Sequence, residues 1–91
     1  QPLEKYKNKT IIYSMGNFIF GGNRHPENRT IIYQHTITLT SNNKVSKETG
    51  DIIPCYVYTG DTNNWQPAPI KYKATKKKVL NFMNGKRKSP L

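Results

Sequence analysis

The chain has 91 residues, of which 15 are Lys or Arg and 5 are Asp or Glu, so its formal net charge is +10. This length suffices for one small domain and excludes two. Apolar residues make up 34% of the chain, against roughly 45–50% in a typical soluble domain, which is enough to bury one face of a sheet. We therefore expect that in isolation the chain exposes apolar surface, pairs its open strand edges with a second copy, or is only marginally stable.

Two strands are predicted in the first forty residues. β-branched and aromatic residues indicate a strand over residues 10–15, which breaks at Gly16-Asn17 and continues over residues 18–20. A second strand over residues 29–39 shows an apolar set that alternates with a set becoming polar after Ile32. This alternation predicts one buried and one solvated face. The buried set is Ile31, Tyr33, His35, Ile37 and Leu39.

The middle of the chain predicts a third strand and a long irregular segment. Residues 41–44 are typical of a turn, and residues 45–48 of a short strand or part of the loop. The third strand is expected over residues 51–59, with Pro54 indicating an edge position or a bulge. Cys55 is the single cysteine of the chain, which excludes an internal disulfide, and it is expected to be a small buried side chain. Residues 60–69 are expected to be irregular, with Trp65 anchoring them to the sheet.

A helix is predicted over residues 76–84, capped by Thr75 and ended by Gly85. The apolar residues expected on one face of this helix are Val79, Leu80 and Met83. Short loops between the strands favour antiparallel pairing. The fold class is therefore α+β, with a small antiparallel sheet over the β-rich residues 1–70 and a basic tail, residues 71–91, that holds the helix.

The positive charge is concentrated in that tail. Residues 71–91 contain eight Lys or Arg residues and no acidic residue, which leaves a net charge of +2 for the rest. Such a tail attracts nucleic acid, an anionic membrane surface or an acidic polymer, or serves only as a solvated terminus.

Residues suited to catalysis are scarce. The five carboxylates are scattered, with no pair spaced for general acid and base catalysis. Ser14 has no histidine at a motif spacing, and the glycines form no dinucleotide or P-loop fingerprint. No second ligand lies at a useful spacing from His35, so we predict no metal site in this chain.

One segment carries a family resemblance. Ser14 begins the run Ser-Met-Gly-Asn-Phe-Ile-Phe-Gly-Gly-Asn-Arg, followed by Pro26 and by Thr30-Ile31-Ile32-Tyr33-Gln34. This pattern resembles the C-terminal part of CapA-type proteins, a bacterial family associated with poly-γ-glutamate capsule synthesis. Residues 52–55, residues 63–69 and the helical tail resemble later segments of the same family. The resemblance therefore covers most of the chain, in order.

The resemblance implies a larger parent protein. Its domain would be an α/β sandwich like that of the calcineurin-like metallophosphatases, and this chain would be its C-terminal part, completed by the missing N-terminal part. Family members carry their metal ligands upstream, in Asp, Asn and His motifs. The resemblance therefore implies a divalent metal in the parent, and no cofactor and no complete active site in this chain. The implied setting is the cell surface, with capsule synthesis machinery and an acidic polymer as partners.

The resemblance also suggests site residues. In such domains the loop Ser14-Met15-Gly16-Asn17 borders the metal site, so Ser14, Gly16 and Asn17 are expected near substrate, with the Asn17 amide orienting substrate or a ligand. Arg24 and His25 follow in a polar loop, where they can bind an anion together or remain exposed loop residues.

Three function classes remain open. Within the family, the parent is either a metal-dependent hydrolase acting through upstream ligands or a non-catalytic component of capsule synthesis, export or anchoring. Outside the family, the chain is a basic β-module that binds nucleic acid or another polyanion, with ten aromatic residues available for stacking. These aromatics form no RNA-binding signature and the basic residues lie in the tail, which argues against nucleic acid.

Overall fold

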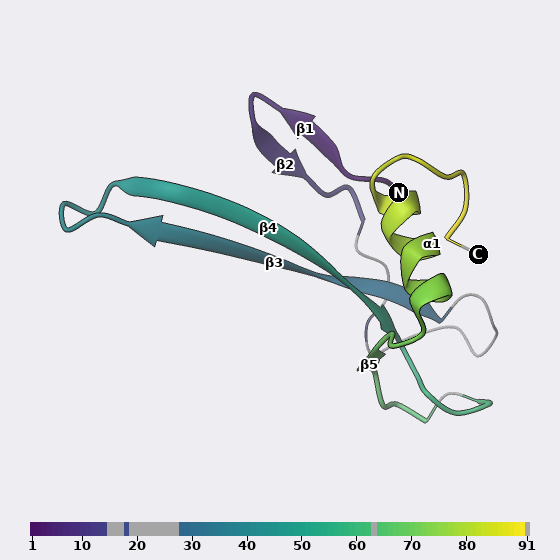
Figure 1. The fold of residues 1–91 in the computed structure, drawn as a ribbon. Helices are drawn as coiled ribbons and strands as arrows, with labels where there is room; N and C mark the ends of the chain where they lie inside the picture. The colour runs from purple at the N-terminus through teal and green to yellow at the C-terminus, as the bar shows by residue number, and fades with distance from the viewer. Residues whose placement is uncertain (15–17, 19–27, 63, 91) are drawn as a thin grey trace.

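A computed structural model describes residues 1–14, 18, 28–62 and 64–90 of the chain (Figure 1). Two small antiparallel sheets and one helix make up these residues, which confirms the predicted α+β fold. One sheet pairs β1 with β2, and the other has the strand order β3-β4-β5. The elements are β1 (Glu4–Tyr6), β2 (Lys9–Ile11), β3 (Arg29–Leu39), β4 (Val45–Tyr56), β5 (Ala68–Pro69) and α1 (Lys73–Met83).

The long ribbon of β3 and β4 dominates the shape of the molecule. Its register runs from Arg29 opposite Tyr56 to Leu39 opposite Val45, with an irregularity between Thr38 and Leu39. Figure 1 shows this ribbon extending away from α1 and β5. The radius of gyration is 15.1 Å, against roughly 12 Å for a compact domain of this length. Much of the ribbon therefore lies outside the core.

The predicted strand over residues 29–39 is confirmed as β3, but its burial differs from the expectation. Only Ile31 of the alternating apolar set is buried, whereas Ile37 and Leu39 are 51% and 55% exposed. The side chain of His35 is 41% exposed, so its predicted burial is wrong. The alternation is present, but none of the described residues covers the far half of this face (Figure 1).

Residues 45–48, for which a short strand or a loop was expected, join the strand expected from residue 51 in the single strand β4. Gly50 lies inside it, opposite His35, and the ring of Tyr33 leans over this glycine. A Cβ at position 50 would stand 2.0 Å from the Tyr33 hydroxyl oxygen. The glycine therefore permits close approach of an aromatic ring within the strand. The strand ends at Tyr56, and residues 57–59 leave it although Val57 and Tyr58 are buried.

Pro54 lies in the central strand of its sheet, so the predicted edge or bulge position is wrong. The Pro54 carbonyl accepts a hydrogen bond of 2.9 Å from the Ile70 amide. In an extended residue the amide and carbonyl point the same way, so the missing N–H faces the side of β5. The hydrogen bonds between β4 and β3 therefore lose no donor at this position.

The hairpin of β1 and β2 was not predicted. Lys7 and Asn8 form its turn, with φ values of 50° and 62°, the conformation that type I′ hairpin turns require at both central residues. Of the strand expected over residues 10–15, only Thr10 and Ile11 belong to β2, and residues 12–14 lie outside any strand. Within the proposed continuation over residues 18–20, only Phe18 lies among the described residues, and it is not in a strand.

The helix begins three residues earlier than predicted. Tyr72 is its N-cap residue and makes no side-chain capping bond, so the assignment of Thr75 as the cap is wrong. The predicted end at Gly85 is confirmed. Gly85 has a φ of +74°, its amide donates to the Phe82 carbonyl, and the Lys86 amide donates to the Asn81 carbonyl. These two bonds form a Schellman motif, which satisfies the last carbonyls of the helix.

The core lies where α1 packs against the near ends of β3 and β4. The buried cluster consists of Ile31, Ile70, Val79 and Met83, with Leu3, Ile52, Tyr56 and Phe82 packed around it. The Leu3 amide donates a 2.7 Å hydrogen bond to the Met83 carbonyl, which ties the N-terminal segment to the end of the helix. Cys55 is 1% exposed, as predicted for a small buried side chain.

The segment of residues 60–69 differs from the expectation in two ways. Trp65 is 57% exposed with a φ of 58°, so its predicted role as an anchor to the sheet is wrong. β5 forms within residues 60–69, which the sequence had indicated to be irregular.

Within the part of the chain that the structure describes, no helix combines the length and apolar character needed to cross a membrane.

We predict that Gly85→Ala destabilises the chain by about 1 kcal/mol, because an L side chain is strained at positive φ. Among the described residues nothing lies within 4 Å of the new Cβ, so the cost arises from the backbone conformation alone. Urea unfolding followed by circular dichroism measures this loss. Lys86→Ala is the matched control, since it keeps the backbone bond of the motif; equal midpoints for the two variants would contradict the prediction.

Candidate functional site

Of the five site residues predicted from the sequence, only Ser14 lies among the described residues. It is exposed and follows β2, beside a cavity of about 110 Å³ that Arg29 and Phe82 also line. The Arg29 guanidinium donates to the Pro90 carbonyl at the same place. Gly16, Asn17, Arg24 and His25 lie outside the described residues, so their predicted roles stay predictions.

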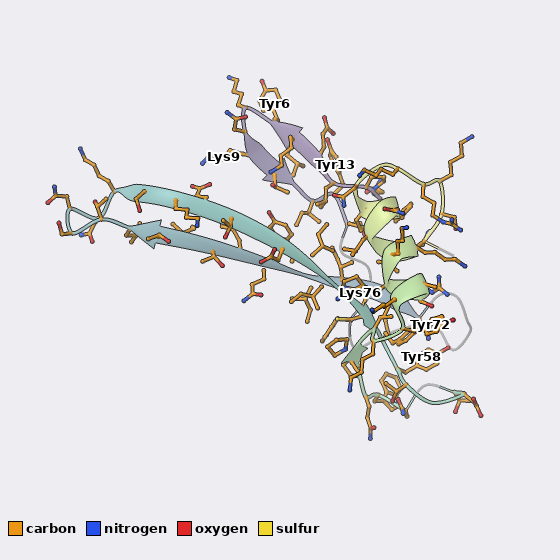
Figure 2. All side chains as sticks on the ribbon, in the orientation of Figure 1. Tyr6, Lys9, Tyr13, Tyr58, Tyr72 and Lys76 are labelled. Atoms are coloured by element: carbon orange, nitrogen blue, oxygen red, sulfur yellow. The ribbon has the colours of Figure 1, made fainter. Side chains whose placement is uncertain are left out.

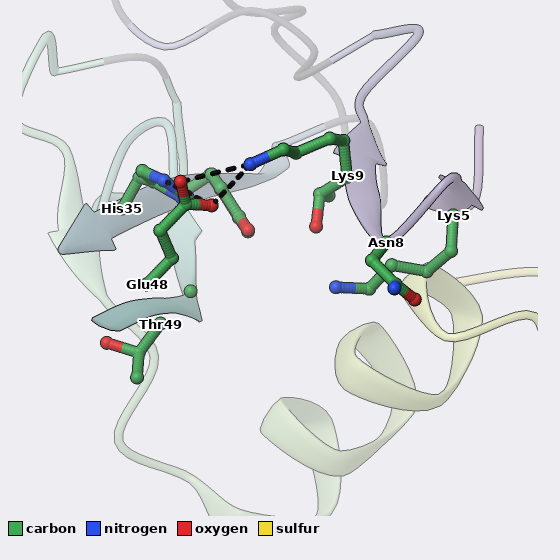
Figure 3. A pocket seen from close by; sticks show the side chains of 9 residues that line it. Lys5, Asn8, Lys9, His35, Glu48 and Thr49 are labelled. Atoms are coloured by element: carbon green, nitrogen blue, oxygen red, sulfur yellow. Dashed lines mark hydrogen bonds and ion pairs between the residues drawn. The ribbon is translucent and has the colours of Figure 1, made fainter. Parts of the chain in front are cut away.

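A larger cavity of about 400 Å³ lies between the β1–β2 hairpin and the β3–β4 ribbon, and we call it the basic cavity (Figure 3). Its walls come from segments far apart in the sequence. The hairpin and the turn within it supply Lys5, Asn8, Lys9 and Thr10, and the ribbon supplies Tyr33, His35, Glu48, Thr49 and Gly50.

An ion pair spans this cavity. The Lys9 ammonium lies 3.0 Å and 3.1 Å from the two carboxylate oxygens of Glu48, and thus joins the hairpin to the ribbon. The His35 Nε2 atom lies 3.9 Å from one of the same oxygens. The Lys9 side chain is 70% exposed and that of Glu48 is 27% exposed. A pair so accessible to water contributes at most about 1 kcal/mol.

The remaining charge of the cavity is positive. Lys5 points from the hairpin into the space between the elements and forms no ion pair with any described residue (Figure 3). Lys5 and Lys9 face the single carboxylate of Glu48, which leaves one uncompensated positive charge even with His35 neutral. Hydroxyl groups of Thr10, Tyr33 and Thr49 add hydrogen-bond donors and acceptors. This arrangement suits a ligand that carries carboxylate or phosphate groups.

The ribbon wall of the basic cavity is shaped by Tyr33. Its ring stacks on that of His35, with centroids 6.1 Å apart and an angle of 27° between the planes. Gly50 leaves the space that the Tyr33 ring fills. The position of the imidazole is therefore set by an aromatic neighbour, in addition to its proximity to Glu48.

The basic cavity does not provide a metal site. Among residues 1–14, 28–62 and 64–90, no three His, Cys, Asp or Glu side chains lie close enough together to hold an ion. His35 and Glu48 are two potential ligands, and Lys9 already occupies the carboxylate. The described residues alone therefore do not hold a divalent metal, whose ligands the family resemblance places upstream in the parent.

Cys55 does not serve as a nucleophile in this structure. Burial raises the pKa of its thiol above the usual value, although a backbone contact at Ile32 acts in the opposite direction. The thiol also points toward the Ile53 carbonyl, at 3.4 Å. A buried, protonated thiol is unreactive because the thiolate is the attacking form.

No pattern in the sequence identified the residues of the basic cavity. Lys9 and Glu48 are 39 positions apart, and no motif connects them. The detectable signal was the turn: Lys7-Asn8 between Glu4–Tyr6 and Lys9–Ile11 predicts a hairpin with a lysine on each strand. Its contact with the ribbon could not be predicted from local patterns.

We predict that a double-mutant cycle of Lys9→Met and Glu48→Gln gives a coupling free energy below about 1 kcal/mol in dilute buffer. The coupling should fall toward zero in 1 M salt, because exposed charges are screened over roughly 3 Å at that ionic strength. Urea unfolding of the four proteins at both salt concentrations measures it. A coupling that persists in 1 M salt would mean that the pair is shielded from solvent.

Comparisons of the chain with protein-family models, with curated proteins and with solved structures found no match.

Proposed function

We propose that the chain is the C-terminal part of a CapA-type protein of poly-γ-glutamate capsule synthesis, export or anchoring, and that it contributes a surface that attracts the acidic polymer. The run from Ser14 to Arg24 and the segments after it support the family assignment. The observation that carries the polymer assignment is the excess of positive side chains around the basic cavity, where Lys5 and Lys9 face one carboxylate.

The rest of the charge distribution supports the same proposal. All three lysines at positions 76, 77 and 78 are exposed on α1, and Lys86, Arg87 and Lys88 follow the helix. No acidic residue lies in the first turn of α1, nor anywhere in residues 71–91. A surface with this excess of one sign raises the local concentration of a polyanion and its rate of association.

In this proposal the chain works at the cell surface as part of a larger domain and holds no complete active site of its own. A divalent metal and any hydrolytic activity belong to upstream residues of the parent. The reading frame upstream of Gln1 tests the assignment: a His-Pro-His segment preceded by Asp, Asn and His motifs supports it, and an unrelated domain contradicts it.

We predict that Lys5→Gln weakens binding of poly-γ-glutamate about two- to fivefold, the effect of one partly screened charge. Lys44→Gln removes the same charge from the exposed turn at the far end of the ribbon and is the matched control. Binding is measured by fluorescence anisotropy of labelled polymer at several salt concentrations. Equal effects of the two variants would assign the attraction to net charge alone.

The same assay separates the two polyanions. Single-stranded DNA of equal charge serves as competitor, and we expect the acidic polymer to bind more tightly at physiological salt. Tighter binding of the DNA, with an affinity that falls steeply with salt, would favour the basic β-module that binds nucleic acid.

We also predict that Asn17→Ala lowers the activity of the intact parent without unfolding it, because its amide is proposed to orient substrate or a metal ligand. Capsule polymer produced by cells carrying the variant gives the activity, and the melting temperature of the purified parent gives the stability. Ser46→Ala, on the exposed face of β4, is the control. Unchanged polymer production, or loss through misfolding, would remove Asn17 from the site.

A further inference from the structure

A third cavity, of about 480 Å³, lies between β5, the start of α1 and the segment that follows β4, on residues distinct from those of the basic cavity. We call it the Asn28 pocket. Aromatic and small apolar side chains form much of its wall, and Figure 2 shows Tyr58 and Tyr72 close to β5. Its lining includes Asn28, Tyr56, Tyr58, Pro69, Lys71 and Tyr72.

Asn28 is the unusual residue of this pocket. It is 1% exposed, and its backbone carbonyl accepts a 2.7 Å hydrogen bond from the Val57 amide. Neither its side-chain nitrogen nor its side-chain oxygen has a hydrogen-bond partner in the part of the chain that the structure describes. The large majority of buried side-chain polar atoms in proteins are paired. An amide with both its donor and its acceptor unpaired therefore suits a ligand that supplies both.

The start of α1 adds a preference for negative charge beside this amide. Tyr72, which lines the pocket, is the N-cap residue of the 11-residue helix, and its side chain makes no capping hydrogen bond to the amides of the first turn. No acidic residue lies in that turn. Lys71 lines the same pocket and Lys73 begins the helix, whereas Asp61 is the only carboxylate in the lining described. A helix N-terminus with adjacent lysines attracts a carboxylate.

We propose that the Asn28 pocket binds an extended acidic peptide segment of a partner protein. A peptide amide supplies a carbonyl for the Asn28 nitrogen and an N–H for the Asn28 oxygen. The tyrosine rings and Pro69 contact the apolar parts of the peptide, and a carboxylate next to the bound amide faces Lys71 and the start of α1. The volume lies within the usual range of roughly 300–1,000 Å³ for ligand sites. A nucleobase can satisfy the same amide, but a peptide fits better because Lys71 is the only basic residue among the described residues of the lining that could meet a phosphate chain.

Isothermal titration calorimetry of the full 91-residue chain with the blocked peptide acetyl-Glu-Ala-Pro-Glu-amide tests the proposal. Asn28→Leu keeps the branched shape and removes both hydrogen bonds, so we expect it to weaken binding roughly tenfold. Tyr72→Ala removes a side chain that is 70% exposed and should weaken binding several-fold without affecting the fold. Tyr6→Ala, at a tyrosine that is 61% exposed on the hairpin, is the matched control and should leave binding unchanged.

Three further readouts separate this role from the alternatives. Asn28→Leu should leave the melting temperature equal or higher, because the unpaired amide stabilises nothing in the free chain; a lower melting temperature would make Asn28 structural and overturn the proposal. Glutarate, a dicarboxylate without an amide, should bind at least tenfold more weakly than the peptide. Equal binding of glutarate, tighter binding of AMP, or no binding of the peptide would each overturn it.

Discussion

The packing of α1 against the near ends of β3 and β4 is the interaction on which the rest of the structure depends. Val79 and Met83 of the helix meet Ile31 and Ile70 in the buried cluster, and burying one such side chain stabilises the fold by about 1.5–3 kcal/mol. Leu3 joins this cluster and also bonds through its amide to the end of the helix. The hairpin that follows Leu3 is therefore held from the same core as the long ribbon.

This small core explains why the far half of the ribbon is uncovered. Ile37, Leu39 and Val45 are each more than half exposed, at 51%, 55% and 53%. An isolated two-stranded ribbon is at best marginally stable in water, so an apolar face of this kind is stabilised when another surface covers it. The rest of a parent domain, as the proposed family assignment implies, or a second copy of the chain would cover this face. The Lys9–Glu48 pair tethers the ribbon only weakly.

The basic cavity and the Asn28 pocket both lie at joints between elements, and their chemistry differs. Lys5 and Lys9 reach the basic cavity on long side chains, so this cavity attracts a polyanion through its charge and over a distance. Asn28 is fixed by burial and by its backbone bond to Val57. A fixed amide discriminates by hydrogen-bond geometry, since a ligand that lacks the matching groups leaves it unpaired. In their proposed roles, the basic cavity attracts a polymer and the Asn28 pocket recognises a peptide.

The sequence by itself determined those features whose causes are local. Alternation defined β3 from residue 29 to residue 39, and Gly85 marked the end of α1, two residues beyond Met83. Tertiary structure decided the rest. Pairing with β3 joined residues 45–48 and the strand expected from residue 51 into the single strand β4. The absence of a covering element among the described residues left His35 and Trp65 exposed. The ion pair of Lys9 with Glu48 and the unpaired amide of Asn28 depend on segments distant in the chain. A local pattern specifies which faces of an element are apolar, but only the packing of other elements decides which faces are covered and which polar groups find partners.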